Sequence, residues 1–194
     1  MSDTYLTISA PAEGYYSEKR SKFLAFVHHV ETPEEVKQIV ARYRGQYYDA
    51  RHVCYAYVLG PERLDFRAND DGEPSSTAGR PILGQINSHG LTDVLIVVVR
   101  YYGGVNLGTS GLIVAYRQAA ADAISHARVE ERLVEEVIDY EFPYEMMNSV
   151  MRIVKDMSPR IVSQTFDATC HIRLAIRRSL ASQMRERLKK ASFE

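Results

Sequence analysis

The chain of 194 residues has a hydrophobic content of 45% and a charged content of 25%, which are ordinary values for a globular protein of one or two domains. Its formal net charge of −1 excludes a global basic field, so any contact with nucleic acid must come from local charge. Two cysteines, Cys54 and Cys170, are too few for a thiolate zinc site. Since no signal peptide or membrane-spanning run is recognisable, the expected location is the cytoplasm.

Apolar runs predict three strands in the first half of the chain: Phe23–Val30, His52–Leu59 and Asp93–Tyr102. Between the first two strands, Thr32 as N-cap and Pro33 at the first helical position predict a helix that ends at Gly45. The third run is continuous and rich in β-branched residues. It therefore predicts a central strand that is buried on both faces of a sheet.

Three carboxylates stand close together before a predicted helix: Asp70, Asp71 and Glu73. Such a cluster could bind a cation or supply a general base. It could equally be a polar turn that leads into a helix capped by Ser76 or Thr77. The turn is the favoured interpretation, because acidic turns before helices are common and no calcium-loop spacing is met.

Four glycines follow the predicted central strand: Gly103, Gly104, Gly108 and Gly111. A helix is predicted from Thr109 or Ser110 to about His126, with small alanines that let it lie close to the sheet. Glycines before a helix expose backbone N–H groups that attract anions, and Arg100 and Asn106 could add a charge and a donor. Neither the phosphate-loop spacing nor GxGxxG is present, so both a phosphate or RNA-backbone contact and a structural turn remain open.

A short basic cluster, Lys19, Arg20 and Lys22, precedes the first predicted strand. It could meet a polyanion, although a solvated sheet edge is the commoner explanation of so short a run. His52 opens a strand without a nearby nucleophile or ligand set, so a structural role is favoured over catalysis. The neighbours His28 and His29 point to opposite faces of a strand and cannot form a metal site by themselves.

After Ala127 the pattern predicts a strand, a helix, two strands and a helix: 133–142, 144–157, 160–166, 169–177 and 180–191. This order indicates a small ferredoxin-like α+β domain that lacks its last strand. Its first and last strands should be neighbours with acidic residues opposite basic ones on the outer face. Such pairing favours cross-strand ion pairs over an RNA platform, which would carry stacking aromatic residues there.

The stretches "DDGEPSSTAGRPI" and "VVVRYYGGVNLGTSGLIVAY" closely resemble the two signature stretches of the IMPACT family, which includes the YigZ-like proteins of bacteria. The segments "EKRSKF" and "HVCYAY" extend the resemblance over nearly all of residues 15–125. Three positions depart from the family pattern. Ser76 and Ser110 stand where the family has glycine, and Val114 stands where many members carry Lys or Arg.

The resemblance implies an α+β fold of two domains. Residues 1–128 would form a βαβ-containing domain like one found in a small-subunit ribosomal protein and in elongation factor G, and residues 129–194 would form a ferredoxin-like domain. It also implies a binding or regulatory protein of translation whose partner is RNA, the ribosome or a translation factor. No cofactor, metal, membrane or catalytic residue is expected.

Two other hypotheses stay open. The acidic turn beside the glycines could serve a small-molecule or metal-dependent enzyme. Alternatively, the two signature stretches could pack on each other, with Glu73 paired to Arg100 or capping a helix. The candidate site residues are Lys19, Arg20, Lys22, His52, Asp70, Asp71, Glu73, Thr77, Arg100, Tyr101, Gly103, Gly104, Asn106, Gly108 and Gly111.

Overall fold

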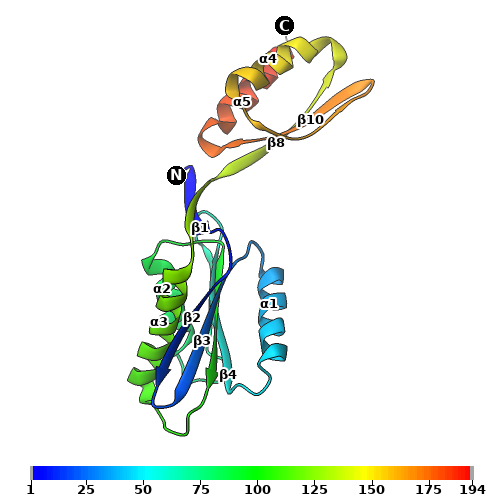
Figure 1. Cartoon of the computed structure of the whole chain (residues 1–194). Helices are drawn as coiled ribbons and strands as arrows, with labels where there is room; N and C mark the ends of the chain where they lie inside the picture. Colours follow the sequence, from blue (N-terminus) through cyan, green and yellow to red (C-terminus); the bar gives the residue numbers. More distant parts are fainter. Residues whose placement is uncertain (1, 193–194) are drawn as a thin grey trace. The chain divides into compact units, whose positions relative to one another are not determined.

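The computed structural model describes residues 2–192, which form two compact units (Figure 1). The first unit comprises residues 5–132, and the second comprises residues 133–192 together with residues 2–4. Each unit combines helices with an antiparallel sheet, so the fold class is α+β. No helix in this part of the chain is long and apolar enough to cross a membrane.

The first unit is built on a five-stranded antiparallel sheet with the order β2-β3-β6-β4-β5. Helix α1 covers one face of this sheet, and helices α2 and α3 cover the other (Figure 1). Because β3 and β4 are each antiparallel to β6, they are parallel to one another and α1 connects them as a βαβ crossover. The elements are β2 (Ala12–Glu18), β3 (Ser21–His29), α1 (Pro33–Gln46), β4 (His52–Leu59), β5 (Asp65–Asn69), α2 (Gly79–Ser88), β6 (Val94–Tyr101) and α3 (Gly108–His126).

Strand β6 confirms the predicted central strand. It lies in the middle of the sheet, and all its residues from 94 to 100 are buried. Since side chains alternate along a strand, Val94, Ile96 and Val98 face the core shared with α2 and α3. Leu95, Val97 and Val99 face the core beneath α1. A continuous apolar run is therefore what a strand between two helical layers requires.

Helix α3 lies close against the sheet, as its alanines predict. Ala115, Ala119, Ala120 and Ala123 are all fully buried. A Cβ on Gly14 of β2 would lie only 2.2 Å from the backbone nitrogen of Ala123, so this contact requires glycine. The α3 backbone is thereby fixed against β2.

The helix starts are partly as predicted. Thr32 caps α1, since its Oγ1 accepts a hydrogen bond from the Glu35 amide at 3.2 Å. The predicted cap of α2 by Ser76 or Thr77 is wrong. The Asp70 carboxylate, eight and nine residues upstream, accepts hydrogen bonds from Ala78 N at 3.2 Å and Gly79 N at 2.8 Å. A distant carboxylate thus replaces the local hydroxyl.

Four strands escaped prediction: β1 (Thr4–Ile8), β2, β5 and β7 (Val129–Leu133). β1 and β7 form a two-stranded sheet, and β2 and β5 are the edges of the five-stranded sheet. Edge strands carry more polar side chains than central strands, and four of the five residues of β5 are exposed. Because β7 pairs with β1, the first unit extends to Arg132. The domain boundary between residues 128 and 129 stays a prediction.

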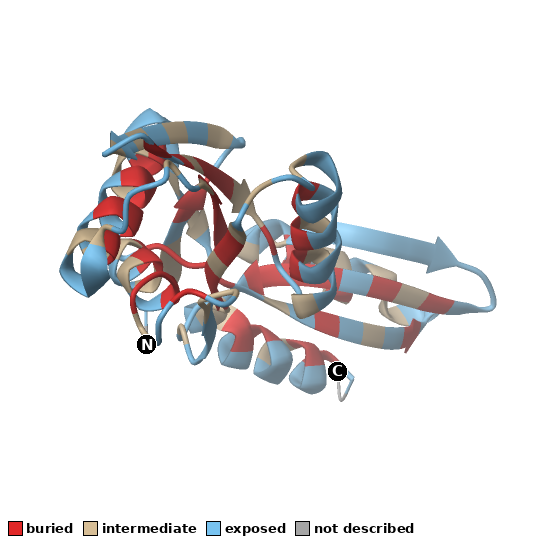
Figure 2. Ribbon diagram, turned by 90° about the horizontal axis from the view of Figure 1, so that it is seen from below, coloured by how far each residue is buried: buried red, intermediate tan, exposed pale blue. Residues whose placement is uncertain are grey.

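The second unit holds a three-stranded antiparallel sheet with the order β8-β10-β9 and two helices packed on one of its faces. The predicted pairing of the first and last strands is confirmed, and Arg173 lies opposite Asp139 with an N–O distance of 3.5 Å. Buried residues alternate with more exposed ones in the first part of β10, residues 174–176 are all buried, and β9 is exposed along its whole length (Figure 2). The elements are β8 (Glu135–Pro143), a short 3₁₀ helix η1 (Tyr144–Met146), α4 (Met147–Met157), β9 (Arg160–Phe166), β10 (Thr169–Arg177) and α5 (Arg178–Ala191).

Candidate functional site

One end of the five-stranded sheet brings together the motifs that the sequence separates. In the register of β3, β6 and β4, Lys22 lies opposite Tyr101, and His52 lies opposite Arg100. The glycine turn after β6 contacts the turn between β2 and β3. A Cβ on Gly103 would lie 2.2 Å from the carbonyl carbon of Arg20. The basic cluster, His52 and the glycine turn are therefore neighbours in space.

The carboxylates of the acidic turn hold the fold together instead of converging on one point. Asp70 caps α2 as described above, and its other oxygen accepts from Ser76 N at 2.9 Å. Asp71 accepts from Val53 N at 2.7 Å and lies 3.4 Å from the Arg44 guanidinium. Each carboxylate has its own backbone or cationic partner. The carboxylate oxygens of the turn therefore do not converge on one position where they could coordinate a cation together.

Glu73 is the centre of a buried polar network, and its side chain is only 3% exposed. Arg100 Nη1 lies 2.8 Å from both carboxylate oxygens, and the Tyr116 hydroxyl donates to Oε2 at 2.6 Å. His52 Nε2 lies 3.2 Å from Oε1, while its Nδ1 lies 2.7 Å from the carbonyl oxygen of Asp71. The pairing of Glu73 with Arg100, one of the alternatives left open by the sequence, is thus present.

Burial shapes the chemistry of the groups around this network. It raises the pKa of the Cys54 thiol and of the Tyr116 hydroxyl far above their ordinary ranges. Both groups are therefore protonated at neutral pH. A buried protonated thiol is a poor nucleophile, so Cys54 serves packing.

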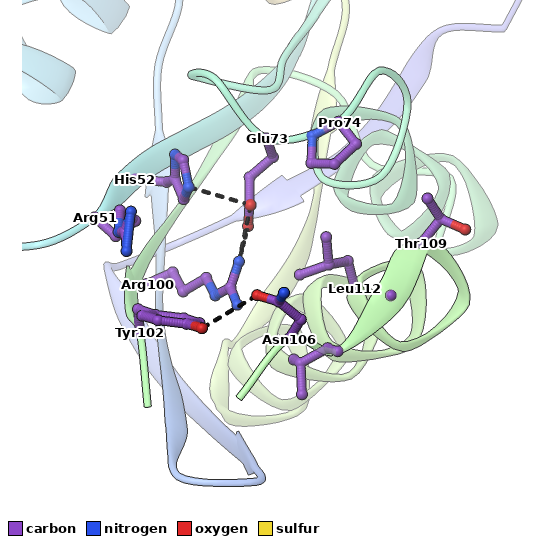
Figure 3. A pocket seen from close by; sticks show the side chains of 11 residues that line it. Arg51, His52, Glu73, Pro74, Arg100, Tyr102, Asn106, Thr109 and Leu112 are labelled. Atoms are coloured by element: carbon purple, nitrogen blue, oxygen red, sulfur yellow. Dashed lines mark hydrogen bonds and ion pairs between the residues drawn. The ribbon is translucent and has the colours of Figure 1, made fainter. Parts of the chain in front are cut away.

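A cavity of about 400 Å³ opens beside this network, and we call it the α3 cavity (Figure 3). It is lined by Arg51, His52, Glu73, Pro74, Arg100, Tyr102, Asn106, Leu107, Gly108, Thr109 and Leu112. Arg100 and Glu73 form its floor, and the start of α3 forms one wall. The side chain of Arg51 lies over the Tyr102 ring, 4.8 Å from its centre. Cationic and polar groups thus surround a partly apolar hollow.

The predicted site residues divide into two groups. His52, Glu73, Arg100, Asn106 and Gly108 line the α3 cavity. The others support the surrounding backbone or lie beside it. Gly104 and Gly108 adopt left-handed φ values of 88° and 71°, which favour glycine.

Three further predicted residues have local structural contacts. Thr77 donates its hydroxyl to the Pro74 carbonyl at 2.5 Å. Tyr101 donates to Asp49 at 2.8 Å, and its burial together with this carboxylate raises its pKa to about 12. Gly111 lies within α3, where a Cβ would approach Leu107 to 3.1 Å.

Six lining residues were not among the predicted site residues: Arg51, Pro74, Tyr102, Leu107, Thr109 and Leu112. Arg51 and Tyr102 each adjoin a residue that was singled out, His52 and Tyr101. A strand end followed by a turn brings consecutive side chains to the same opening. Extending each candidate by one residue would have found both.

The exposed cations at this end of the first unit are unpaired. Lys19, Arg20, Lys22 and Arg51 are exposed, and none forms an ion pair with any residue of the described chain. Two of them stand at strained positions, since Lys19 and Arg20 have φ values of 46° and 71° in the tight turn between β2 and β3. Asn-Gly is the preferred pair for such a turn, and here two cations occupy it.

A separate cluster of potential metal ligands lies elsewhere in the first unit. His29, Glu31 and Asp93 place one ligand atom each within 4.8 Å of one another, and no other group of three or more was found among residues 2–192. The sequence did not predict this cluster. Arg132 Nη1 lies 3.2 Å from His29 Nε2, so a guanidinium already supplies positive charge there.

Comparisons with known proteins match this architecture. The family model of the Impact N-terminal domain matches residues 19–124. IMPACT family member YvyE of Bacillus subtilis (strain 168) is 33% identical over 150 residues, which cover 77% of this chain and 69% of the relative. IMPACT family member YigZ of Escherichia coli (strain K12) is 30% identical over 178 residues, which cover 90% of this chain and 86% of the relative. A solved crystal structure of a hypothetical protein aligns over 100% of this chain and 94% of its own, with 28% identity and a TM-score of 0.76.

Proposed function

The chain belongs to the IMPACT family, and we propose that it is a binding protein of the translation machinery that contacts RNA through the end of its first unit. Membership in the family supports a regulatory role in translation, as the signature stretches imply. The observation that carries the choice of RNA is the group of four exposed cations, without an ion-pair partner among the described residues, at the sheet end that holds the α3 cavity. Phosphate backbones are bound chiefly through such cations.

The strained turn between β2 and β3 supports this choice. A non-glycine residue in the left-handed region is disfavoured by about 1–2 kcal/mol. Residues in such conformations persist mainly where the surrounding structure or a function requires them. At Lys19 and Arg20 the turn projects two charges from the sheet end that also carries Lys22 and Arg51.

An enzymatic function finds less support in the same geometry. The acidic turn that would serve as acid, base or metal ligand is engaged in capping α2, bonding Val53 and neutralising Arg100. The nearby Cys54 thiol is buried and protonated. A general base needs a free carboxylate or imidazole within reach of a substrate, and these groups already have partners.

We also propose identities for the two units. The second unit would be a ferredoxin-like domain without its last strand, which its βαββα order and its β8-β10-β9 sheet support. The first unit would correspond to the domain shared by a small-subunit ribosomal protein and elongation factor G. Its βαβ crossover is compatible with that correspondence.

A titration of the full chain with fluorescently labelled single-stranded RNA and with ribosomal RNA tests the proposed function. The apparent affinity should fall steeply with salt, with a slope of about −0.7 per phosphate contacted on single strands. The double variant Lys19→Ala/Lys22→Ala should bind more weakly and show a shallower slope. Absence of binding at low salt, or an affinity that does not change with salt, would refute RNA contact.

The matched control removes two charges elsewhere in the first unit. Lys37 on α1 and Arg67 on β5 are exposed and form no ion pair with described residues. Lys37→Ala/Arg67→Ala should therefore leave the affinity and the salt slope close to those of the native chain. An equal loss in both double variants would indicate a general charge effect.

A further inference from the structure

The rim of the α3 cavity presents hydrogen-bond donors. The Tyr102 hydroxyl donates to Asn106 Oδ1 at 3.1 Å, which occupies the oxygen of that amide and leaves its NH₂ group to donate (Figure 3). Arg51 adds a guanidinium without a carboxylate partner among the described residues. Donors without matching acceptors favour a ligand that only accepts, such as an oxyanion.

The wall formed by α3 adds to this preference. The helix has 19 residues, and no side chain of residues 2–192 caps its N-terminus. The first turn of a helix leaves four backbone N–H groups without partners and carries a partial positive charge. Gly108 and Thr109, which begin this turn, line the cavity. In contrast, Thr32 caps α1 and Asp70 caps α2.

The floor of the cavity includes Arg100, a buried cation that does not use all of its hydrogen-bond donors within the described chain. Arg100 is only 6% exposed, and its Nε is buried without a hydrogen-bond partner in the described chain. Glu73 is the one acidic residue among those that line the cavity. Arg100 neutralises its charge, and the Tyr116 hydroxyl donates a hydrogen bond to its Oε2. The remaining field is therefore positive. Because Glu73 and Arg100 neutralise each other, the excess positive charge at the cavity comes from Arg51 and from the start of α3.

The size and lining of the cavity indicate more than a single ion. Its volume of about 400 Å³ lies in the range of small-molecule sites and greatly exceeds that of a phosphate group. The Tyr102 ring and the apolar side chains of Leu107 and Leu112 form the rest of its surface. An aromatic ring beside a cation suits the stacking of a nucleobase.

We propose that the α3 cavity binds a nucleoside monophosphate unit. Its phosphate lies at the start of α3 between Arg51 and Asn106, and its base lies against Tyr102 and the apolar wall. The proposal rests on the proposed function in one respect, because an RNA chain is one source of such a unit. A free nucleotide is the other source.

Calorimetric titration of the full chain with uridine 5′-monophosphate and adenosine 5′-monophosphate tests the proposal, with uridine and inorganic phosphate as comparison ligands. The nucleotides should bind at least tenfold more tightly than either comparison ligand. Arg51→Ala and Asn106→Asp should each weaken nucleotide binding by about tenfold, since the first removes a charge and the second places a carboxylate against the phosphate. Both residues are exposed, so these variants should keep the fold, and Lys37→Ala is the matched control.

A short RNA with a 5′-phosphate, compared with the same RNA carrying a 5′-hydroxyl, distinguishes the two sources. Tighter binding of the phosphorylated RNA that depends on Arg51 supports the cavity as a site for a chain end. Binding of free nucleotides alone supports a free ligand. Nucleosides that bind as well as nucleotides, no nucleotide binding at all, or variants without effect would each overturn the proposal.

Failure of this proposal is distinguishable from failure of the proposed function. RNA binding that depends on Lys19 and Lys22, in a chain that does not bind nucleotides, would refute the cavity and leave the RNA contact in place. Nucleotide binding that depends on Arg51, in a chain that does not bind RNA, would support the cavity and refute the RNA contact.

Discussion

Replacing Glu73 by alanine should destabilise the first unit by about 4–6 kcal/mol. Removing one partner of a buried ion pair typically costs about 3–5 kcal/mol, because the other charge stays buried without compensation. Arg100 would be left in that state, since its side chain is 6% exposed. The fully buried Tyr116 hydroxyl would also lose its acceptor at 2.6 Å, a loss that costs about 1–3 kcal/mol by itself. Because both losses come from one carboxylate they are not fully additive, so the expected total stays at the lower end of the sum of about 4–8 kcal/mol.

Urea unfolding of the full chain measures this change, and amide hydrogen exchange of β6 assigns it to the first unit. The double variant Glu73→Leu/Arg100→Met should recover most of the lost stability, because it leaves no buried charge unpaired. Asp65→Ala, which removes an exposed carboxylate on β5, should stay within about 0.5 kcal/mol of the native chain. A loss below about 1 kcal/mol for Glu73→Ala would show that the floor of the α3 cavity is not a dry ion pair.

Three further outcomes follow from burial and backbone geometry. Burial and, to a lesser extent, Arg42 lower the pKa of His28 in the folded chain below its ordinary value of 6.5. As the pH falls, His28 is therefore protonated in the unfolded chain at a higher pH than in the folded chain. Stability should therefore fall as pH drops from about 7 towards 5, and His28→Gln should flatten this part of a urea-midpoint profile; an unchanged profile would contradict the reasoning. Cys54 and Cys170 are fully buried, so neither should react with a thiol reagent at pH 8 until urea unfolds the chain, and prompt labelling of the folded protein would contradict their placement. Ser76 has a φ of 65°, so Ser76→Gly should raise stability by about 0.5–1 kcal/mol in a thermal melt, whereas a loss would show that the serine conformation is not strained.

Much of the fold could be predicted from local patterns. A β-branched run without polar interruption indicates a central strand, and β6 is one. The Thr-Pro pair at residues 32 and 33 marks the start of α1, and the order of elements after residue 133 matches the second unit. Each of these signals depends on side chains within a few residues of one another.

The edge strands and the α2 cap could not be predicted in the same way. β5 is exposed at four of its five positions, so its sequence lacks the run of buried apolar residues that marks a central strand. The cap of α2 comes from Asp70, which reaches Gly79 only because the intervening turn folds back on the helix. No local capping pattern encodes such a contact.

The candidate site was predicted in its parts and not in its arrangement. Glu73 and Arg100 are 27 residues apart, and their contact depends on the register of β6 and the path of the acidic turn. The sequence offered their pairing as one of several alternatives. Arg51 and Tyr102 were missed because their neighbours, His52 and Tyr101, carried the recognisable pattern.

The salt dependence of RNA binding by the full chain tests the central claim most directly. We expect affinity for single-stranded and ribosomal RNA to fall steeply between low and moderate salt, with a shallower slope for Lys19→Ala/Lys22→Ala and an unchanged slope for Lys37→Ala/Arg67→Ala. No binding at low salt, or an affinity that neither salt nor the first double variant alters, would contradict a role of this surface in contacting RNA.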